Sequence, residues 1–438
     1  MTVTRKTFLT GLGAGALLAA GGCQSGSLGS SGGGSGNRVP LKLLYPTGNT
    51  DTPIAEGLMK AFNESQDKYQ VSIEGRPGGS EGDNIVKTRL ATGEMPELFQ
   101  YNSGSLMRNI NPERNLVDLS GESWASSLTD PFKLAISMDG KVYGAPWGSG
   151  SGGGIMYNKK LYAELGLSVP KNWDEFLANS ARVKAAGKIP VLQSYGTTWT
   201  SQLFILGDYA NVAKADPQWA ERYTRNQAKF SQEPALAGFQ YTEELFKAGY
   251  FNADAAAATL EQVTEKLAMG EAAHYPVLSG AIDTIKKNHP DKVADVGFFG
   301  VPGKNATENI LTTWVCNGLY IPKALTGEKL EGAKEFVKFV ASEAGCKAQN
   351  AATRPNGPFG VRSCRPTGEV PEVVKDILAY SDQDKSVAAL EFVSPIKGPN
   401  LEHIVILVGT GQKTAVEAAA LYDEDLKKQA QQLGLPGW

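Results

Sequence analysis

Strand-like and helix-like segments alternate from the start of the main body of this chain, and this alternation restricts its fold more than any other feature. An apolar run at residues 41–45 precedes apolar residues at helical spacing over 54–62 and a strand-like alternation at 71–73. The pattern repeats with a helical segment at 85–90 and a strand at 97–101. We therefore predict an α/β fold with mostly parallel sheets covered by helices on both faces.

The rest of the chain continues this mixed pattern. We predict amphipathic helices around Trp173 and Phe176 and at the carboxyl end of the chain. The further predicted segments are a strand at 189–192, helices within 235–270, strands at 294–301 and 311–321, and helices at 330–350 and 416–433.

The first 22 residues have the composition of an export signal. A basic start at Arg5 and Lys6 is followed by an uncharged apolar stretch and by small residues before Cys23. This arrangement resembles a bacterial lipobox, although Ala20 stands where that motif usually has Leu. The resemblance implies cleavage before Cys23 and lipidation of its sulfur, and an ordinary buried thiol is the alternative. The basic start also resembles a twin-arginine motif with one Arg replaced by Lys, so the export route stays open.

Residues 23–38 read as a tether, because nearly every residue from 24 to 36 is Gly or Ser. Such a segment cannot bury enough apolar surface to fold, and its end-to-end distance is about 20 Å. The predicted location is the outer face of the cell membrane, with the lipid on Cys23 as the only membrane contact.

Composition limits the classes of partner. The formal net charge is -3, acidic and basic residues are mixed along the chain, and 41% of the residues are hydrophobic. The body after the tether is long enough for two domains. It has no basic stripe for nucleic acid, and the charge balance favours a neutral or weakly charged ligand.

Three cysteines follow Cys23, so at least one of them stays free. Cys346 and Cys364 flank an irregular segment and are candidates for a disulfide, but two buried thiols would give the same sequence. The sequence leaves both possibilities open.

Several stretches together resemble one family. Asp139-Gly140-Lys141-Val142-Tyr143-Gly144-Ala145-Pro146 is followed by Tyr157-Asn158-Lys159-Lys160-Leu161 and by Pro170-Lys171-Asn172-Trp173-Asp174-Glu175-Phe176. Residues 92–99, 269–273 and 411–414 add further motifs in the expected order. The chain resembles the solute-binding proteins of ABC importers, and most of all the sugar-binding group typified by maltose-binding protein.

The resemblance implies two α/β lobes joined by a hinge of three crossings, with solute held in the cleft between them. By that analogy the crossings lie near 147–154, 296–303 and 340–343. The first contains the glycine-dense residues 148–154, which we predict to bend as a hinge. The implied boundaries are 39–147 plus 303–340 for the first lobe and 148–302 plus 341–438 for the second.

Candidate ligand contacts combine aromatic rings, which stack on the apolar faces of sugars, with polar groups that bind hydroxyls. Core packing is the alternative for each ring, and we prefer that reading for Trp124, Trp173 and Trp219. Arg354 offers a forked guanidinium for sugar hydroxyls or a carboxylate. The full set of candidates is Thr50, Asp51, Tyr101, Asn102, Trp147, Tyr195, Trp199, Trp314 and Arg354.

The sequence does not single out a catalytic centre, a metal site or a cofactor. The three histidines are far apart, and Gly11-Leu12-Gly13-Ala14-Gly15 lies within the export signal rather than after a strand. We expect a non-enzymatic monomer that captures a sugar or oligosaccharide and delivers it to permease subunits. The alternatives are another polar solute, such as a polyamine or a polyol phosphate, and a surface glycosidase with paired carboxylates.

Overall fold

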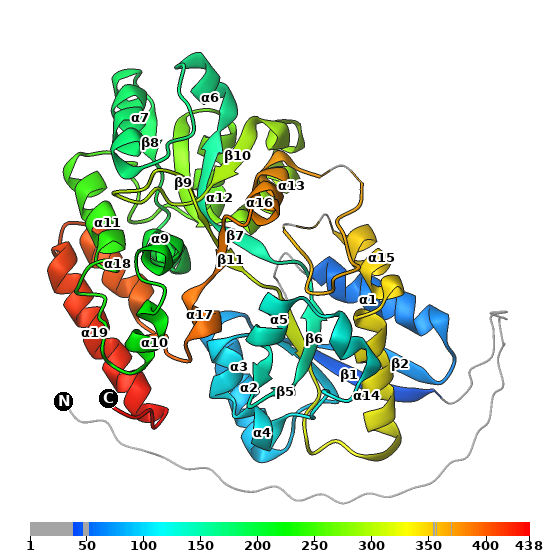
Figure 1. Cartoon of the computed structure of the whole chain (residues 1–438). Helices are drawn as coiled ribbons and strands as arrows, with labels where there is room; N and C mark the ends of the chain where they lie inside the picture. Colours follow the sequence, from blue (N-terminus) through cyan, green and yellow to red (C-terminus); the bar gives the residue numbers. More distant parts are fainter. Residues whose placement is uncertain (1–37, 47–51, 354, 356, 369) are drawn as a thin grey trace, which may run out of the picture. The chain divides into compact units, whose positions relative to one another are not determined.

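The computed structural model describes residues 38–46, 52–353, 355, 357–368 and 370–438. Two β-sheets dominate this part of the chain, and each has its own helices (Figure 1). Among the described residues, none of the helices has the length and apolarity needed to cross a membrane.

The first sheet has five strands. Three of them are parallel, whereas β12 runs antiparallel to both of its neighbours, so the sheet is mixed. In spatial order the strands are β2 (Tyr69–Arg76), β1 (Val39–Pro46), β3 (Leu98–Tyr101), β12 (Asn317–Tyr320) and β6 (Gly144–Trp147).

Helices from two separate parts of the chain, residues 52–135 and 327–352, cover the first sheet. Figure 1 shows α15 beside α1, and a Cβ on Gly57 of α1 would lie only 2.8 Å from Cβ of Ala352. The elements here are α1 (Thr52–Ser65), α2 (Gly79–Thr92), α3 (Ser105–Asn109), α4 (Pro112–Asn115), η1 (Ser123–Ser127), α5 (Asp130–Ala135), α14 (Gly327–Val340), α15 (Glu343–Ala352) and the hairpin β4 (Ser137–Met138) with β5 (Lys141–Val142).

The second sheet has six strands and is also mixed. Its long strand β7 (Ser151–Asn158) is antiparallel to β9, β10 and β11. Parallel pairs form at the two sides of the sheet, β8 with β9 and β11 with β13. The other strands are β8 (Ile189–Val191), β9 (Ala272–Leu278), β10 (Val296–Phe299), β11 (Leu311–Trp314) and β13 (Ser386–Ala388).

The helices of the second sheet include the carboxyl-terminal pair α18 and α19, which pack with α11 (Figure 1). Capping boxes begin α12 at Thr259 and α19 at Thr414. The elements are α6 (Lys159–Glu164), α7 (Trp173–Ala185), η2 (Thr198–Gln202), α8 (Leu203–Gly207), α9 (Tyr209–Ala215), α10 (Trp219–Thr224), α11 (Ala237–Lys247), α12 (Leu260–Ala268), η3 (Ser279–Ala281), α13 (Ile282–Asn288), η4 (Pro290–Asp295), α16 (Glu372–Asp382), α17 (Leu390–Val393), α18 (Leu401–Gly409) and α19 (Ala415–Gln432).

The α/β prediction is confirmed, but two predicted segments are divided. The strand predicted at 311–321 is β11 and β12, which belong to different sheets because the chain passes between the sheets at Val315 and Cys316. The helix predicted at 330–350 is α14 and α15, which are separated at Ala341 and Ser342. The Ser342 side chain caps the second of these helices.

Hydrophobic packing follows the two sheets. Several apolar residues between positions 341 and 364, including Ala341, Phe359 and Val361, pack with the first sheet. Leu311 packs with the second sheet. These groupings differ in detail from the lobe limits implied by the resemblance, which stay a prediction.

Cys346 and Cys364 form a disulfide in this structure, which resolves the pairing that the sequence left open. Cys316 is a buried free thiol. Burial raises the pKa of the Cys316 thiol to about 12, so the group stays neutral.

Candidate functional site

One edge of the first sheet gathers four strand ends. Strands β1, β2 and β3 are parallel, and β6 shares their direction because both β3 and β6 are antiparallel to β12. Pro46, Arg76, Tyr101 and Trp147 therefore end their strands at the same edge, where Asn317 begins β12. In α/β sheets this is the edge where ligands bind.

One edge of the second sheet is built in the same way. Strands β9 and β11 run opposite to β7, and β8 and β13 run parallel to them. The ends of these four strands, among them Leu278, Trp314 and Ala388, consequently lie at the edge where Ser151 begins β7.

Two short connections join these edges. Residues 148–150 separate Trp147 from Ser151, and residues 315–316 separate Trp314 from Asn317. Such lengths span at most about 14 Å and about 11 Å. The carboxyl-terminal edges of the two sheets must therefore face each other.

The structure brings three predicted residues together on the first edge. Tyr101 and Trp147 pair with adjacent residues of β12 from its two sides, and Asn102 follows Tyr101 with an exposed side chain. Trp147 is buried beside the ring of Tyr45, with their centroids 5.6 Å apart. Among the described residues, the Tyr101 hydroxyl and the Trp147 indole nitrogen are buried without a hydrogen-bond partner of good geometry. Both groups retain hydrogen-bonding capacity.

Trp314 lies on the second edge and is half-buried. A Cβ on Gly153 would lie 2.0 Å from its Cζ3, so the indole rests directly on the backbone of β7. The ring also packs with Ala135 of α5 and with Phe392 of α17, which belong to opposite sheets. Trp314 is thus placed where residues from the two sheets meet.

Tyr195 and Trp199 follow β8, three strands away from Trp314 in the order of the second sheet. This separation corresponds to about 14 Å. Tyr195 is 3% exposed, and a Cβ on Gly409 of α18 would lie 1.7 Å from its hydroxyl oxygen. The Tyr195 ring is therefore packed against a helix, whereas Trp199 is half-buried in η2.

Four predicted residues cannot be placed. Thr50, Asp51 and Arg354, as well as Cys23, lie outside the described residues.

Charged side chains also gather at these edges, and the sequence reading missed them. Arg76 ends β2 with 6% exposure, and its guanidinium donates to the carbonyl oxygens of Pro77 at 3.0 Å and Gln100 at 3.3 Å. Asp83 of α2 is half-buried, and burial raises the pKa of its carboxyl group despite nearby Lys87, Arg76 and Lys397. The available signal for Arg76 was its position between the predicted strand at 71–73 and the Pro-Gly-Gly sequence at 77–79.

Lys397, which follows α17 beside the second sheet, places a positive charge near Asp83. Its Nζ lies 2.9 Å from a carboxylate oxygen of Glu391, next to α17. Arg108 of α3 makes a further link between the sheets, because its guanidinium donates to the carbonyl oxygen of Phe392 at 3.1 Å. The facing edges therefore offer aromatic surface together with charged hydrogen-bonding groups.

Comparison with known proteins identifies this arrangement. A family model described as bacterial extracellular solute-binding protein matches residues 47–346, which is more than half of the chain. The chain belongs to this family.

Individual relatives are distant in sequence. The multiple sugar-binding protein of Streptococcus mutans is 22% identical over 318 residues, which cover 70% of this chain and 72% of the relative. The melibiose/raffinose/stachyose-binding protein of Bacillus subtilis is 22% identical over 330 residues, 73% of this chain and 75% of the relative. A solved chitin oligosaccharide binding protein superposes with a TM-score of 0.74 at 17% identity, and the match covers 90% of this chain and all of the other. These similarities establish the fold and the family.

The connections between the sheets are braced by a third segment in this family member. The backbone N–H of Gly150 donates to the carbonyl oxygen of Pro358 at 2.7 Å, and Ser149 forms a β-bridge with Phe359. A Cβ on Gly360 would lie 3.0 Å from Sγ of Cys316. The segment 357–360 therefore packs on both connections.

The glycines of the first connection have two different roles. Gly148 has φ of 78°, which favours glycine, and a Cβ there would meet only Cδ1 of Ile54 at 3.7 Å. Gly152, Gly153 and Gly154 instead lie within β7 against neighbouring side chains and backbone, so close packing explains them. Within residues 148–154, only Gly148 has a φ that favours glycine, and the hinge stays a prediction.

Among the residues that the structure describes, no group of three or more His, Cys, Asp or Glu side chains is arranged to hold a metal ion.

Proposed function

We propose that this extracellular solute-binding protein serves an ABC importer by capturing a sugar or oligosaccharide between two lobes built on the two sheets. The observation that carries the proposal is the position of Trp314, a half-buried indole on one edge that faces the edge with Tyr101 and Trp147. Aromatic faces and nearby polar groups are the chemistry that binds sugars. The sugar-binding names of the relatives support the same class of solute.

The remaining predictions complete this proposal. Thr50, Asp51, Asn102, Tyr195, Trp199 and Arg354 stay candidate contacts, and we add Arg76 and Asp83 from their places at the first edge. Cys23 carries the lipid that holds the protein at the membrane, and the permease subunits receive the solute there. The lobes correspond to 39–147 plus 303–340 and 148–302 plus 341–438, with limits adjusted where the packing of 341–364 requires it.

Thermal unfolding tests the proposal directly. Residues 38–438 form a compact unit, so a chain that begins after Cys23 is suitable. The ligand panel contains raffinose, stachyose, chitin oligosaccharides, spermidine and a polyol phosphate. A ligand that binds only the folded state stabilises it by about 3 kcal/mol at a hundred times its dissociation constant. We expect one saccharide to raise the midpoint.

A matched pair of variants locates the site. Trp314→Ala should weaken binding of that saccharide about fivefold, because stacking on an aromatic ring is worth about 1 kcal/mol. Phe246→Ala removes an exposed ring at a distant position on α11 and should leave affinity unchanged. A midpoint shift with spermidine or the polyol phosphate alone would discard the carbohydrate assignment and retain the family.

A further inference from the structure

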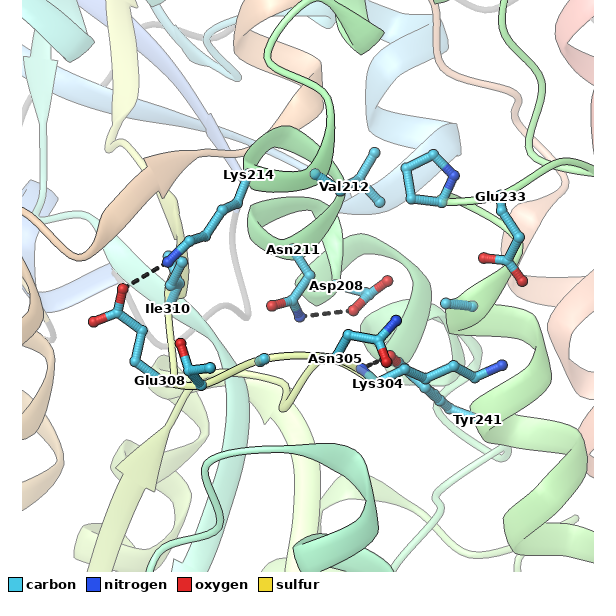
Figure 2. A pocket seen from close by; sticks show the side chains of 16 residues that line it. Asp208, Asn211, Val212, Lys214, Glu233, Tyr241, Lys304, Asn305, Glu308 and Ile310 are labelled. Carbon is cyan, nitrogen blue, oxygen red and sulfur yellow. Dashed lines mark hydrogen bonds and ion pairs between the residues drawn. The ribbon is translucent and has the colours of Figure 1, made fainter.

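A pocket of about 490 Å³ lies beside the second sheet, away from the facing edges. It is formed by α9, the start of α11 and the segment between β10 and β11 (Figure 2). Ile310, which lines it, directly precedes β11, whereas Trp314 ends that strand. The pocket is thus at the opposite end of β11 from the proposed sugar site. Its volume is suitable for a small ligand.

A buried carboxylate lies at the centre of this pocket. Asp208 is 2% exposed, and its Oδ1 accepts a hydrogen bond from Nδ2 of Asn211 at 2.8 Å. Its side chain does not cap α9, although the residue directly precedes that helix. Among the described residues, no Lys, Arg or His forms an ion pair with it within 4 Å. A carboxylate is costly to bury with one amide as its partner, so structural support alone does not account for it.

Three carboxyl groups and two lysines line the pocket, and Glu308 also pairs with Lys385 at 3.4 Å. Figure 2 shows Lys214 and Glu308 together at one end, Glu233 at the other end and Asp208 between them. Lys214 is engaged, because its Nζ lies 2.6 Å from a carboxylate oxygen of Glu308. Lys304 also lines the pocket, and its Nζ donates to Oε1 of Gln240.

Glu233 lies at the exposed rim of the pocket, and the described residues form no ion pair with it within 4 Å. Burial raises the pKa of Asp208 well above its ordinary value, and the charge of Glu233 raises it further, whereas Lys304 opposes the shift. A cation bound beside Asp208 would oppose this shift and favour the ionised form of its carboxyl group.

The uncharged side chains that line the pocket restrict the uncharged part of the ligand. Val212, Pro234 and Ala237 provide a short apolar surface. The Tyr241 ring is unsuitable as a sugar platform, because it is 1% exposed and stacks on Trp173 with a centroid distance of 3.9 Å. The exposed carboxylate of Glu233 disfavours an anion. A compact organic cation matches both the charge and the apolar walls.

We propose that this pocket binds a small organic cation, an ammonium or guanidinium compound with a short apolar body, whose charged group pairs with Asp208 and Glu233. The site is separate from the proposed sugar site, so the protein holds two ligands of different chemistry.

Calorimetric titration of the full chain tests this proposal with three probes of similar size: butylammonium, butylguanidinium and neutral butanol. We expect at least one cation to bind and butanol not to bind, since the alcohol has the apolar body without the charge. Asp208→Asn should abolish cation binding. Glu233→Gln should weaken it about tenfold, and Glu335→Gln, an exposed carboxylate change on α14, should have no effect.

Two variants of the pocket are used so that the proposal can still be tested if one of them does not fold. If Asp208→Asn unfolds, the exposed position of Glu233 makes Glu233→Gln the deciding variant. Absence of heat with both cations and the folded wild-type protein would overturn the proposal. Equal binding of butanol, or unchanged cation affinity in Glu233→Gln, would also overturn it.

Discussion

His274 is a buried histidine held in its neutral form by its surroundings. Its Nδ1 lies 2.8 Å from the carbonyl oxygen of Pro190, which can only accept, so Nδ1 carries the proton. Its Nε2 therefore accepts from the Tyr162 hydroxyl at 2.6 Å. Burial lowers the pKa of His274 from 6.5 to about 3. Protonation of His274 in the folded state would bury a positive charge. Its hydrogen-bond partners, a carbonyl and a hydroxyl, include no carboxylate that could balance this charge.

This environment predicts a specific loss of stability in acid. The folded pKa lies below the unfolded one, so the contribution of neutral His274 is complete above about pH 6.5 and is lost as pH falls towards 3. The limit is about 5 kcal/mol, from roughly 1.4 kcal/mol per pKa unit. Urea unfolding at pH 7, 5 and 4 should show a steeper decline for wild type than for His274→Gln.

His403→Gln is the control for this measurement, because the side chain of His403 is 63% exposed. It should keep the wild-type pH dependence. If His274→Gln declined as steeply as wild type, then His274 would not be the group that links protonation to unfolding.

Packing at the element scale explains why β7 contains three successive glycines. At Gly153 the backbone of the strand is in direct contact with the indole of Trp314, and the spacing leaves no room for a Cβ. The same strand pairs with β9, β10 and β11, so it cannot move away without disturbing the centre of the second sheet. The glycine at 153 therefore sets the position of the candidate sugar platform.

Gly153→Ala is expected to displace Trp314. Overpacking of this kind typically costs about 1–3 kcal/mol of unfolding free energy, and the moved ring should also weaken saccharide binding. Gly121→Ala is a matched control, since nothing lies within 4 Å of a Cβ there. Urea unfolding and calorimetry measure the two effects. Loss of stability with unchanged saccharide affinity would show that the ring does not contact the ligand.

Elements were predictable where local pattern and tertiary role agree. Residues 41–45, 54–62 and 71–73 give β1, α1 and β2 because their apolar periodicity is the one that each element buries. The prediction failed at 311–321, since β11 and β12 have the same apolar composition and only long-range pairing assigns them to different sheets.

Site residues show the same limit. Tyr101 and Trp147 were predictable as residues of one edge because each ends a recognisable strand, and their contact with ligand stays a prediction. Asp83 was missed because its neighbour Lys397 is distant in sequence and meets it only through folding. The pocket around Asp208 likewise combines three separate segments of the chain.

Over the whole molecule, solute capture requires the two sheets and their helices to approach each other when ligand binds. The connection at Gly148 is suited to this movement because glycine accepts both signs of φ. The N–H of Gly148 donates to Oε1 of Gln349 at 2.9 Å, and that of Gly150 donates to the carbonyl oxygen of Pro358. A folded unit of this length has a radius of gyration of about 21 Å. Small-angle scattering should show this value falling when saccharide saturates the protein.

Gly148→Ala tests the role of this connection against Gly140→Ala. The φ angles are 78° and 76°, neither added Cβ would meet an atom closer than 3.7 Å, and only Gly148 lies between the sheets. Alanine at a positive φ costs about 1 kcal/mol, so both variants should lose similar stability. We expect Gly148→Ala alone to change the ligand-driven fall in radius and the saccharide affinity, because it biases the dihedral about which the sheets rotate. Wild-type compaction in both variants would exclude Gly148 as the hinge.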